Sequence, residues 1–361
     1  MLLESEQGGS QKNSLLKRIT RGVVLFLLAS ALGLAGWLFP YAWQKAGGER
    51  TETVIVVIPT GSSVREISKI LGDGGLVEDD VRLLILARYL GLSVKLQAGE
   101  FALHQGQTPG ELLRELASAR QVQHAVTIPE GLTMADIGEI FASGGWCDRD
   151  EFIQQAKDPE FLQSLGLESR TSLEGYLYPD TYHLTRNGQS AADLLRMQVR
   201  RFFSVWQDLQ AAVPSTLSSY EVLILASMVE KETGQASERP LIASVFLNRL
   251  QNKMRLQSDP TVIYGLEDFS GNLTRSHLKT PSPYNTYTLD RLPTGPICNP
   301  GAESLAAVLH PAESKYLYFV SKNDGSHHFS RSLGEHNRAV HKYQRAVKNE
   351  IKRTAEKVVR E

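Results

Sequence analysis

The stretch YEVLILASMVEKETG, from Tyr220 to Gly234, decides how the second half of the chain folds. Its apolar residues leave almost no polar face, so it predicts a helix that enters the core and ends at Gly234. A second helix is predicted over Ser237–Leu250, with Ser237 as its cap and Pro240 in its first turn. The acidic end of the first helix therefore lies beside a tight turn between two helices.

Helical spacing separates the two glutamates at this end. Ser227, Glu230 and Lys231 fall on one side, which predicts that Glu230 points toward water. Glu232 follows Val229 by three residues and falls on the apolar side. Apolar surroundings and the negative end of the helix dipole both raise a carboxyl pKa. A glutamate that is protonated near neutral pH is suited to act as general acid on a glycosidic bond.

Two interpretations of Glu232 stay open at this point. It is either a partly buried structural glutamate paired with Arg239 or Arg249, or a chemical site. The neighbouring segments favour the site, because a helix–turn–helix with an acid at the corner resembles the catalytic corner of lysozyme-like folds. Downstream, QSDP and SPYNTY place amide and carboxylate groups beside aromatic rings, which suits the hydroxyl edges and apolar faces of sugars, although both are also ordinary turn formers. The candidate substrate-binding residues are Glu174, Gln257, Asp259, Tyr284, Asn285 and Tyr287. For Glu174, in EGYLYPDTY, a structural role fits equally well.

The composition excludes several other classes of protein. The chain has 361 residues, enough for two or three domains, and a formal net charge of −1. A nucleic-acid binder would show a strong basic excess, so we expect no nucleic-acid partner. Cys147 and Cys298 form no metal motif and are either paired or free. For His327, His328 and His336 we expect a structural or surface role, because no second cluster has ligand spacing; we therefore expect neither metal nor cofactor.

An uncharged apolar stretch near the amino terminus predicts a membrane anchor over residues 22–44. The basic residues before it are Lys12, Lys17, Arg18 and Arg21. This asymmetry predicts a cytoplasmic tail over residues 1–21 and an extracytoplasmic body after the anchor. The aromatic residues expected to form an outer interfacial belt are Trp37, Phe39, Tyr41 and Trp43. The alternative is a cleaved signal peptide, but the stretch is long and no clear small-residue cleavage site follows it.

A weak internal repeat follows the anchor. VVIPTGSSVREISKIL (Val56–Leu71) resembles VTIPEGLTMADIGEIF (Val126–Phe141), and each copy predicts a short strand, an I-P-x-G turn and an amphipathic helix. Ser63 and Thr133 occupy the positions of helix caps. The two copies therefore predict the same local structure in two places.

The sequence as a whole predicts an α+β fold. Between the repeats, a second helix, a strand around Phe101 and a helix from Pro109 predict a strand–helix–helix–strand module of the LysM kind, or else a generic α+β spacer. We place this module at residues 51–121, a connecting α+β unit at 122–168 and a catalytic domain at 169–361. KYLYFVSK predicts a strand. A long last helix is predicted with one apolar face formed by Val340, Tyr343, Val347, Ile351 and Val358.

Five segments closely resemble the endolytic murein transglycosylases, the MltG or YceG-like family. They cover nearly all of residues 169–340: EGYLYPDTY, LASMVEKETGQASERPLIASVFLNRL, MRLQSDPTVIYG, SPYNTYTLDRLPTGPICNPG and HPAESKYLYFV. The departures are small. Met228 and Ser258 stand for similar residues, and Cys298 lies in a loop position that need not be cysteine.

The resemblance implies a lysozyme-like helical catalytic core with added strands, held at the inner (plasma) membrane by one span. It implies a lytic transglycosylase that cuts the β-1,4 bond between N-acetylmuramic acid and N-acetylglucosamine in nascent peptidoglycan and leaves 1,6-anhydro ends. The family's catalytic acid, which then acts as base, corresponds to Glu232. Penicillin-binding synthases are implied as partners.

Three alternatives remain. A hydrolytic muramidase would need Asp259, Asp180 or Glu174 as a second carboxylate. A non-catalytic scaffold would only bind the cell wall. Glu230, instead of Glu232, would be the acid in the third.

Overall fold

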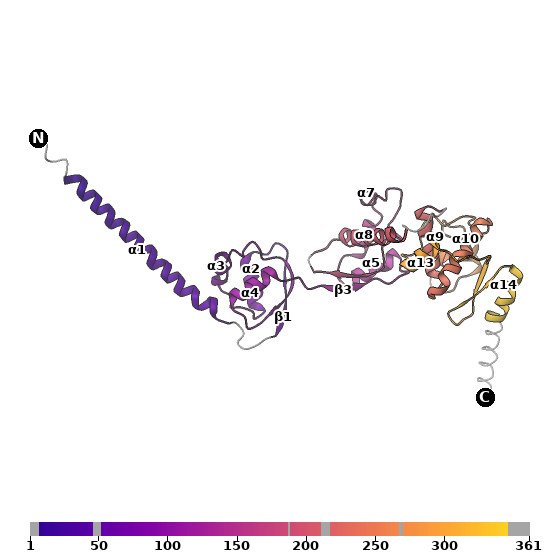
Figure 1. The fold of residues 1–361 in the computed structure, drawn as a ribbon, viewed down its shortest axis with the longest axis horizontal. Coiled ribbons are helices and arrows are strands. Elements are labelled where there is room, and N and C mark those ends of the chain that lie inside the picture. The colour runs from indigo at the N-terminus through magenta and orange to yellow at the C-terminus, as the bar shows by residue number, and fades with distance from the viewer. Residues whose placement is uncertain are drawn as a thin grey trace, which may run out of the picture. The chain divides into compact units, whose positions relative to one another are not determined.

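The computed structural model describes residues 7–45, 52–186, 188–210, 217–266, 269 and 271–345. The chain divides into two units. The first contains residues 1–124 with 184–188, and the second contains residues 125–183 with 189–361. Figure 1 shows the elements of both units in chain order. The segment predicted as a separate connecting unit therefore falls mostly in the same unit as the predicted catalytic domain.

The first unit has the predicted strand–helix–helix–strand order. After the helix α1 (Gln7–Trp43), its elements are β1 (Thr53–Ile58), α2 (Val64–Asp73), α3 (Val81–Tyr89), β2 (Gly99–His104) and α4 (Pro109–Ser118). β1 and β2 pair antiparallel, with Val56 opposite Phe101. Both side chains are buried in the core that α2, α3 and α4 cover. The order of elements is confirmed, and the likeness to LysM stays a prediction.

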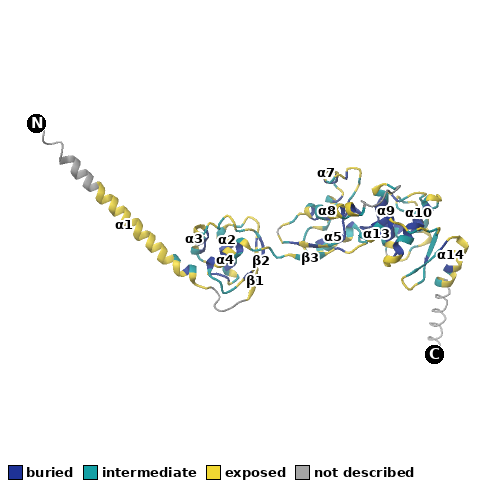
Figure 2. Ribbon diagram, viewed as in Figure 1, coloured by how far each residue is buried: buried dark blue, intermediate teal, exposed yellow. Residues whose placement is uncertain are grey.

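Helix α1 carries a candidate membrane span. Its residues Leu16–Trp43 are long and apolar enough to cross a bilayer. Figure 2 shows that nearly all of this stretch is exposed. One part of the interfacial prediction is wrong, because Tyr41 is 2% exposed and belongs to the core of the first unit. The guanidinium of Arg82 lies 4.4 Å from the centre of its ring.

The internal repeat is confirmed in its local geometry. Ser63 and Thr133 both cap their helices through capping boxes, with Glu66 and Asp136 at the third helical position. The I-P-x-G glycines adopt the left-handed backbone in both copies, with φ of 85° at Gly61 and 76° at Gly131. The same sequence pattern therefore folds in the same way in the two units.

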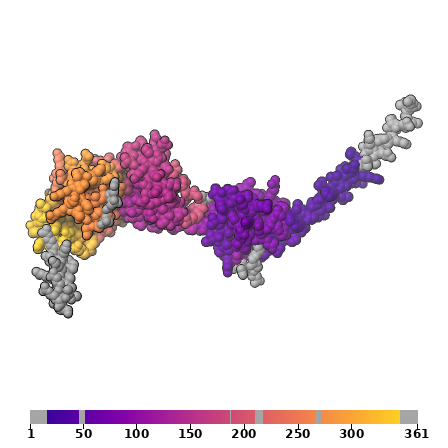
Figure 3. Space-filling model, turned by 180° about the vertical axis from the view of Figure 1, so that it is seen from behind, coloured from indigo at the N-terminus to yellow at the C-terminus, as the bar shows by residue number. Residues whose placement is uncertain are grey.

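The second unit is mainly helical. Its elements are β3 (His124–Thr127), α5 (Met134–Ser143), α6 (Arg149–Gln155), α7 (Pro159–Ser164), β4 (Thr181–Leu184), α8 (Ala191–Gln210), α9 (Ser219–Glu232), the 3-10 turn η1 (Ala236–Glu238), α10 (Arg239–Gln251), α11 (Asp259–Tyr264), α12 (Arg275–Lys279), α13 (Ala302–Leu309), β5 (Tyr318–Ser321), β6 (His327–Ser330), α14 (Leu333–Val340) and the π-helical turn η2 (His341–Arg345). β3 pairs with β4, and β5 pairs antiparallel with β6. In Figure 3 the magenta surface of its earlier elements continues directly into the orange surface of the later ones, in agreement with the contact between α8 and α13.

Helix α9 forms the centre of this unit. Every residue from Val222 to Val229 is buried, and α10, α11 and α13 pack around the helix. Figure 2 shows the buried residues gathered at α9, α10 and α13. A helix with apolar residues on all sides is stable only when it is surrounded in this way.

Two predicted boundaries change. Ser237 lies in η1 and makes no cap, because α10 begins at Arg239, although Pro240 is in the first turn as predicted. KYLYFVSK contains β5 as predicted, but the helix that follows is α14 and the turn η2. Residues 347, 351 and 358 of the predicted long helix lie outside the described residues.

Candidate active site

The carboxyl group of Glu232 projects into a pocket from the last residue of α9. The helix ends there because Thr233 takes an extended backbone conformation with φ −146° and ψ 138°. Burial raises the pKa of Glu232 to about 7, and the negative charge of Asp259 acts in the same direction. The carboxyl terminus of the helix adds to this effect. Near neutral pH the group is therefore able both to give and to accept a proton.

Ser258 holds this carboxyl group in place. Its hydroxyl donates a hydrogen bond of 2.5 Å to Oε1 of Glu232. Ser258 occupies the N-cap position of α11, yet its side chain makes no capping bond. Its backbone is fixed by Thr286 instead, whose Oγ1 accepts from the Ser258 N–H at 2.9 Å. A side chain of a type that usually caps a helix is thus directed at the acid.

The Ser258→Ala change is expected to move the pH dependence of the reaction. The hydroxyl stabilises the charged form of Glu232 and lowers its pKa, so its loss raises that pKa. The protonated acid then persists to higher pH, and the alkaline limb of kcat/KM moves upward by about one pH unit. Rates of glycan cleavage from about pH 5 to about pH 10 measure this shift, a range that brackets the raised pKa. Ser258→Thr keeps a hydroxyl, so its alkaline limb should lie at the same pH as that of the unchanged protein. If Ser258→Ala left the alkaline limb at that pH as well, Ser258 would not set the pKa of Glu232.

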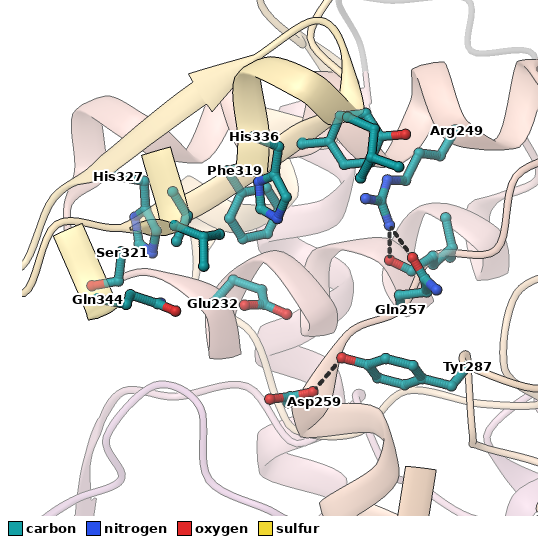
Figure 4. Close-up of a pocket in the computed structure, with 15 residues that line it drawn as sticks. Glu232, Arg249, Gln257, Asp259, Tyr287, Phe319, Ser321, His327, His336 and Gln344 are labelled. Carbon is teal, nitrogen blue, oxygen red and sulfur yellow. Dashed lines mark hydrogen bonds between the residues drawn. The ribbon is translucent and has the colours of Figure 1, made fainter. Parts of the chain in front are cut away.

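The pocket has a volume of about 480 Å³. Figure 4 shows Glu232 between one wall with Asp259 and Tyr287 and an opposite wall with Phe319 and His336. The Tyr287 hydroxyl donates to Oδ1 of Asp259 at 2.5 Å. Three predicted substrate-binding residues therefore lie with Glu232 in this pocket: Gln257, Asp259 and Tyr287. Gln257 has a left-handed backbone with φ 53°, a strained conformation that is common at functional sites.

The other three predicted binding residues lie outside the pocket lining. Glu174 is 4% exposed, and its carboxylate accepts from the Met134 N–H at 3.0 Å and from the Tyr264 hydroxyl at 3.0 Å. The amide of Asn285 donates to the carbonyl oxygens of residues 277, 278 and 280. Tyr284 packs edge-to-face on Tyr264 at 4.7 Å. These contacts give all three residues structural roles in the loops behind the pocket.

Glu230 does not point toward water, so that prediction is wrong. Its side chain is 7% exposed, and it accepts from the Gly301 N–H at 3.1 Å and lies 3.5 Å from the Arg239 guanidinium. Ser227, on the same side, is fully buried and accepts from the Ile297 N–H at 3.0 Å. The polar side of α9 thus binds backbone groups of the 297–301 segment and not solvent. Only Lys231 is exposed, and it donates to the Gly131 carbonyl at 3.2 Å.

Arg239 collects three carboxylates behind the acid. Besides Glu230 it pairs with Glu303 at the start of α13 and lies 3.7 Å from Glu130 of the second I-P-x-G turn. Gly301 allows this approach, because a Cβ at this position would overlap the Glu130 carboxylate. The last turn of α9 is therefore held by residues 130–131 and by residues 301–303 together.

The pocket wall opposite Asp259 was not predicted from the sequence. This wall comes from β5, β6, α14 and η2, and its residues are Tyr318, Phe319, Val320, Ser321, His327, Leu333, His336, Val340 and Gln344. The sequence predicts a structural or surface role for His327 and His336, and the structure places both in the lining of the pocket.

Arg249 also lines the pocket, but it donates to the carbonyl oxygens of Leu256 at 2.7 Å and Leu317 at 2.6 Å and forms no ion pair with Glu232 among the described residues.

Cys147 and Cys298 are both free thiols. Cys298 is buried beside α9, where its Sγ donates to the Ser227 carbonyl at 3.3 Å. Of the two alternatives left open by the sequence, the unpaired one is confirmed.

A buried acid at a helix end, held by a hydroxyl and open to a pocket with aromatic and polar walls, is typical of enzymes that use general acid–base catalysis. The chain belongs to the YceG-like family, whose family model matches residues 56–342. The resemblance carried by the five sequence segments is thereby confirmed.

The chain is similar to curated relatives and to solved structures, of which three are described here. The endolytic murein transglycosylase of Bacillus subtilis (strain 168) is 32% identical over 306 residues, which cover 81% of this chain and 85% of that protein. The endolytic murein transglycosylase of Streptococcus pneumoniae (strain ATCC BAA-255 / R6) is 30% identical, and the match covers 88% of this chain but 64% of that protein. The crystal structure of a YceG-like protein from Listeria monocytogenes is 32% identical with a TM-score of 0.54, covering 80% of this chain and 99% of that one.

Proposed function

We propose that this protein is a lytic transglycosylase that cuts peptidoglycan glycan strands internally, with Glu232 as its acid and base. The observation that carries the proposal is the position of Glu232, a largely buried glutamate whose carboxyl group projects into the pocket from the end of α9 and accepts a hydrogen bond from Ser258. The raised pKa of about 7 supports its role, although burial raises the pKa of Glu174, outside the pocket lining, to about 7 as well. The names of the relatives in B. subtilis and S. pneumoniae support the reaction class and the substrate.

One carboxyl group is enough for this reaction. Glu232 first protonates the glycosidic oxygen as the bond from C1 of N-acetylmuramic acid breaks. The resulting carboxylate then takes the proton of the 6-hydroxyl on the same sugar, and O6 forms a new bond to C1. The proton returns to Glu232, the product has a 1,6-anhydro end, and water is not consumed. A group with a pKa of about 7 suits both steps, because both of its forms are populated at neutral pH.

The positions of the other carboxylates favour this route over hydrolysis. Asp180 is paired with Arg201 at 2.7 Å, outside the pocket lining, and Glu174 is held by the contacts described above. Asp259 lies in the pocket but accepts the Tyr287 hydroxyl. Asp259 is therefore the one candidate among these three for a hydrolytic muramidase, which is the second candidate function.

Product analysis separates the two functions. Mass spectrometry of digested glycan strands is expected to show 1,6-anhydro-muramic ends. These ends are lighter than hydrolysed ends by the mass of one water molecule, roughly 18 Da, because hydrolysis adds water to the cut bond and the transglycosylase reaction does not. Predominantly reducing ends would favour the muramidase, and the Asp259→Asn variant should then lose activity as severely as a Glu232 variant. A full-length protein that binds strands without any cleavage would instead favour the scaffold.

The proposed location follows from α1. Its apolar length and the basic residues before it support a single span at the inner (plasma) membrane, with a cytoplasmic amino terminus and an extracytoplasmic active site. In this position the enzyme would meet nascent strands as penicillin-binding synthases release them, so these synthases are proposed partners. The first unit, with its LysM-like order of elements, would bind glycan or orient the second unit.

A further inference from the structure

The wall opposite Asp259 contains a histidine, His327, whose ring is held in one orientation by a glutamate outside the pocket lining. His327 begins β6, opposite Ser321 of β5, and both residues line the pocket. Its side chain is 12% exposed, and its ring meets Phe319 edge-to-face at 5.5 Å. Figure 4 shows His327 on the same side of the pocket as Ser321 and Gln344, facing the cavity that Glu232 enters.

Glu238 fixes both the position and the tautomer of this ring. One carboxylate oxygen accepts the backbone N–H of His327 at 2.8 Å, and the other meets Nδ1 at 2.7 Å. An ionised carboxylate only accepts hydrogen bonds, so Nδ1 carries the proton. In the neutral ring Nε2 is then a hydrogen-bond acceptor, and it has no hydrogen-bond partner within the described part of the chain.

Glu238 itself is placed unusually for a glutamate. It is 8% exposed and stands at the N-cap position of α10 without capping that helix. Its carboxylate is used for the histidine, which lies 89 residues further along the chain. A buried carboxylate that orients an imidazole toward a pocket is the arrangement by which proteins prepare a histidine for a ligand.

We propose that His327 is a substrate-binding residue, whose Nε2 accepts a hydrogen bond from a hydroxyl group of the glycan opposite Glu232. The inference rests on the proposed function, since it takes the pocket to hold a glycan strand. Glu238 is then a positioning residue that acts through the histidine. The pocket has two polar sides: one performs the proton transfers, and the other fixes the sugar against it.

The alternative is that the pair only joins the β5–β6 hairpin to α10. Both interpretations predict that breaking the pair lowers stability. The two interpretations make different predictions for two variants: one keeps the aromatic ring without its hydrogen-bond acceptor, and the other keeps an acceptor without the ring. His327→Phe keeps an aromatic ring and removes the acceptor, whereas His327→Gln keeps an acceptor oxygen on a side chain of similar reach.

Binding is measured with the full-length protein in detergent micelles, carrying Glu232→Gln to prevent turnover, by calorimetric titration with soluble uncrosslinked glycan strands. His327→Phe is expected to weaken binding about tenfold, the effect of one hydrogen bond, and His327→Gln by less than about threefold. The matched control is His328→Phe, because His328 is the next residue on the same strand and does not line the pocket. It should leave affinity unchanged.

With Glu232 intact, His327→Phe should raise KM more than it lowers kcat, since the contact is present in the bound substrate as well as in the transition state. Equal affinities for His327→Phe and the parent, or equal losses for His327→Phe and His327→Gln, would overturn the proposal. If the parent protein itself fails to bind glycan, the proposed function fails. If it binds and only the His327 comparison fails, the proposed function stands and this inference does not.

Discussion

Glu232→Gln should abolish glycan cleavage, lowering kcat by about a thousandfold or more while the protein still folds and binds strands. The amide has nearly the same shape as the carboxyl group, but it can neither protonate the leaving oxygen nor accept a proton from the 6-hydroxyl. General acid–base catalysis contributes about 10²- to 10⁴-fold per group, and here one group serves two steps. The measurement is the rate of release of anhydro-ended fragments by purified full-length protein in detergent.

The matched comparison is Glu230→Gln, two residues earlier on the same helix. Glu230 is bound by Arg239 and the Gly301 N–H and lies outside the pocket lining, so its amide variant should keep more than about a tenth of the activity. If Glu230→Gln were inactive and Glu232→Gln active, the roles of the two glutamates would be exchanged. Cleavage by Glu232→Gln at the normal rate would contradict the proposed mechanism.

Arg239→Met should cause the largest loss of stability among single changes behind the site. The guanidinium is 9% exposed and is the cation shared by Glu230, Glu303 and Glu130. Its removal leaves the buried Glu230 charge unpaired, which costs about 3 kcal/mol, at the low end for buried pairs because the other two carboxylates are partly exposed. We expect the Tm of the second unit to fall by about 6–12 °C in a thermal unfolding scan.

A double-mutant cycle shows whether Arg239→Met loses stability through the unpaired charge of Glu230 or through the lost volume of the arginine side chain. Arg239→Met combined with Glu230→Gln removes both members of the buried pair and should recover part of the lost Tm. Arg201→Met is the surface comparison, because the side chains of Arg201 and its partner Asp180 are 48% and 36% exposed; it should cost less than about 1 kcal/mol. Equal losses for Arg239→Met and Arg201→Met would mean that the cluster behind α9 does not hold the helix end.

The helix that carries the acid could be predicted from local sequence. The structure begins and ends α9 within about one residue of the prediction, because a long apolar run is a local signal. The predicted glycine stop is not the cause of the end, because Thr233 already leaves the helix with an extended backbone and Gly234 has no left-handed φ. The spacing also placed Glu232 and Glu230 on different sides of the helix, since side-chain direction on a helix follows from position alone. Helical spacing could not predict which groups pack against the side of the helix that carries Glu230.

Whether a helix face meets water depends on what packs against it. Glu230 and Ser227 are covered by residues 297–303, which lie about 70 positions later in the chain. Polar residues on a helix usually indicate solvent, but here they pair with backbone groups of that distant segment. The same cause explains the missed wall of the pocket, because His327 reaches the pocket of Glu232 only after the β5–β6 hairpin folds back.

Motif resemblance was a partial guide to the binding residues. SPYNTY contributes Tyr287 to the pocket, whereas its neighbour Asn285 supports the loop through three backbone carbonyls. A turn sends adjacent side chains in different directions, and no periodic rule tells which of them reaches the substrate. Amides that hold a loop and amides that bind a sugar are the same in sequence.

The burial of Tyr41 affects how far from the bilayer the first unit can lie. If α1 crosses the membrane as proposed, its uncharged stretch from Gly22 to Tyr41 rises about 30 Å, which matches the hydrocarbon thickness. Tyr41 then lies at the outer edge of the bilayer and also belongs to the core of the first unit, with Arg82 against its ring. No slack chain then separates bilayer and domain. We therefore expect the first unit to rest on the lipid headgroups.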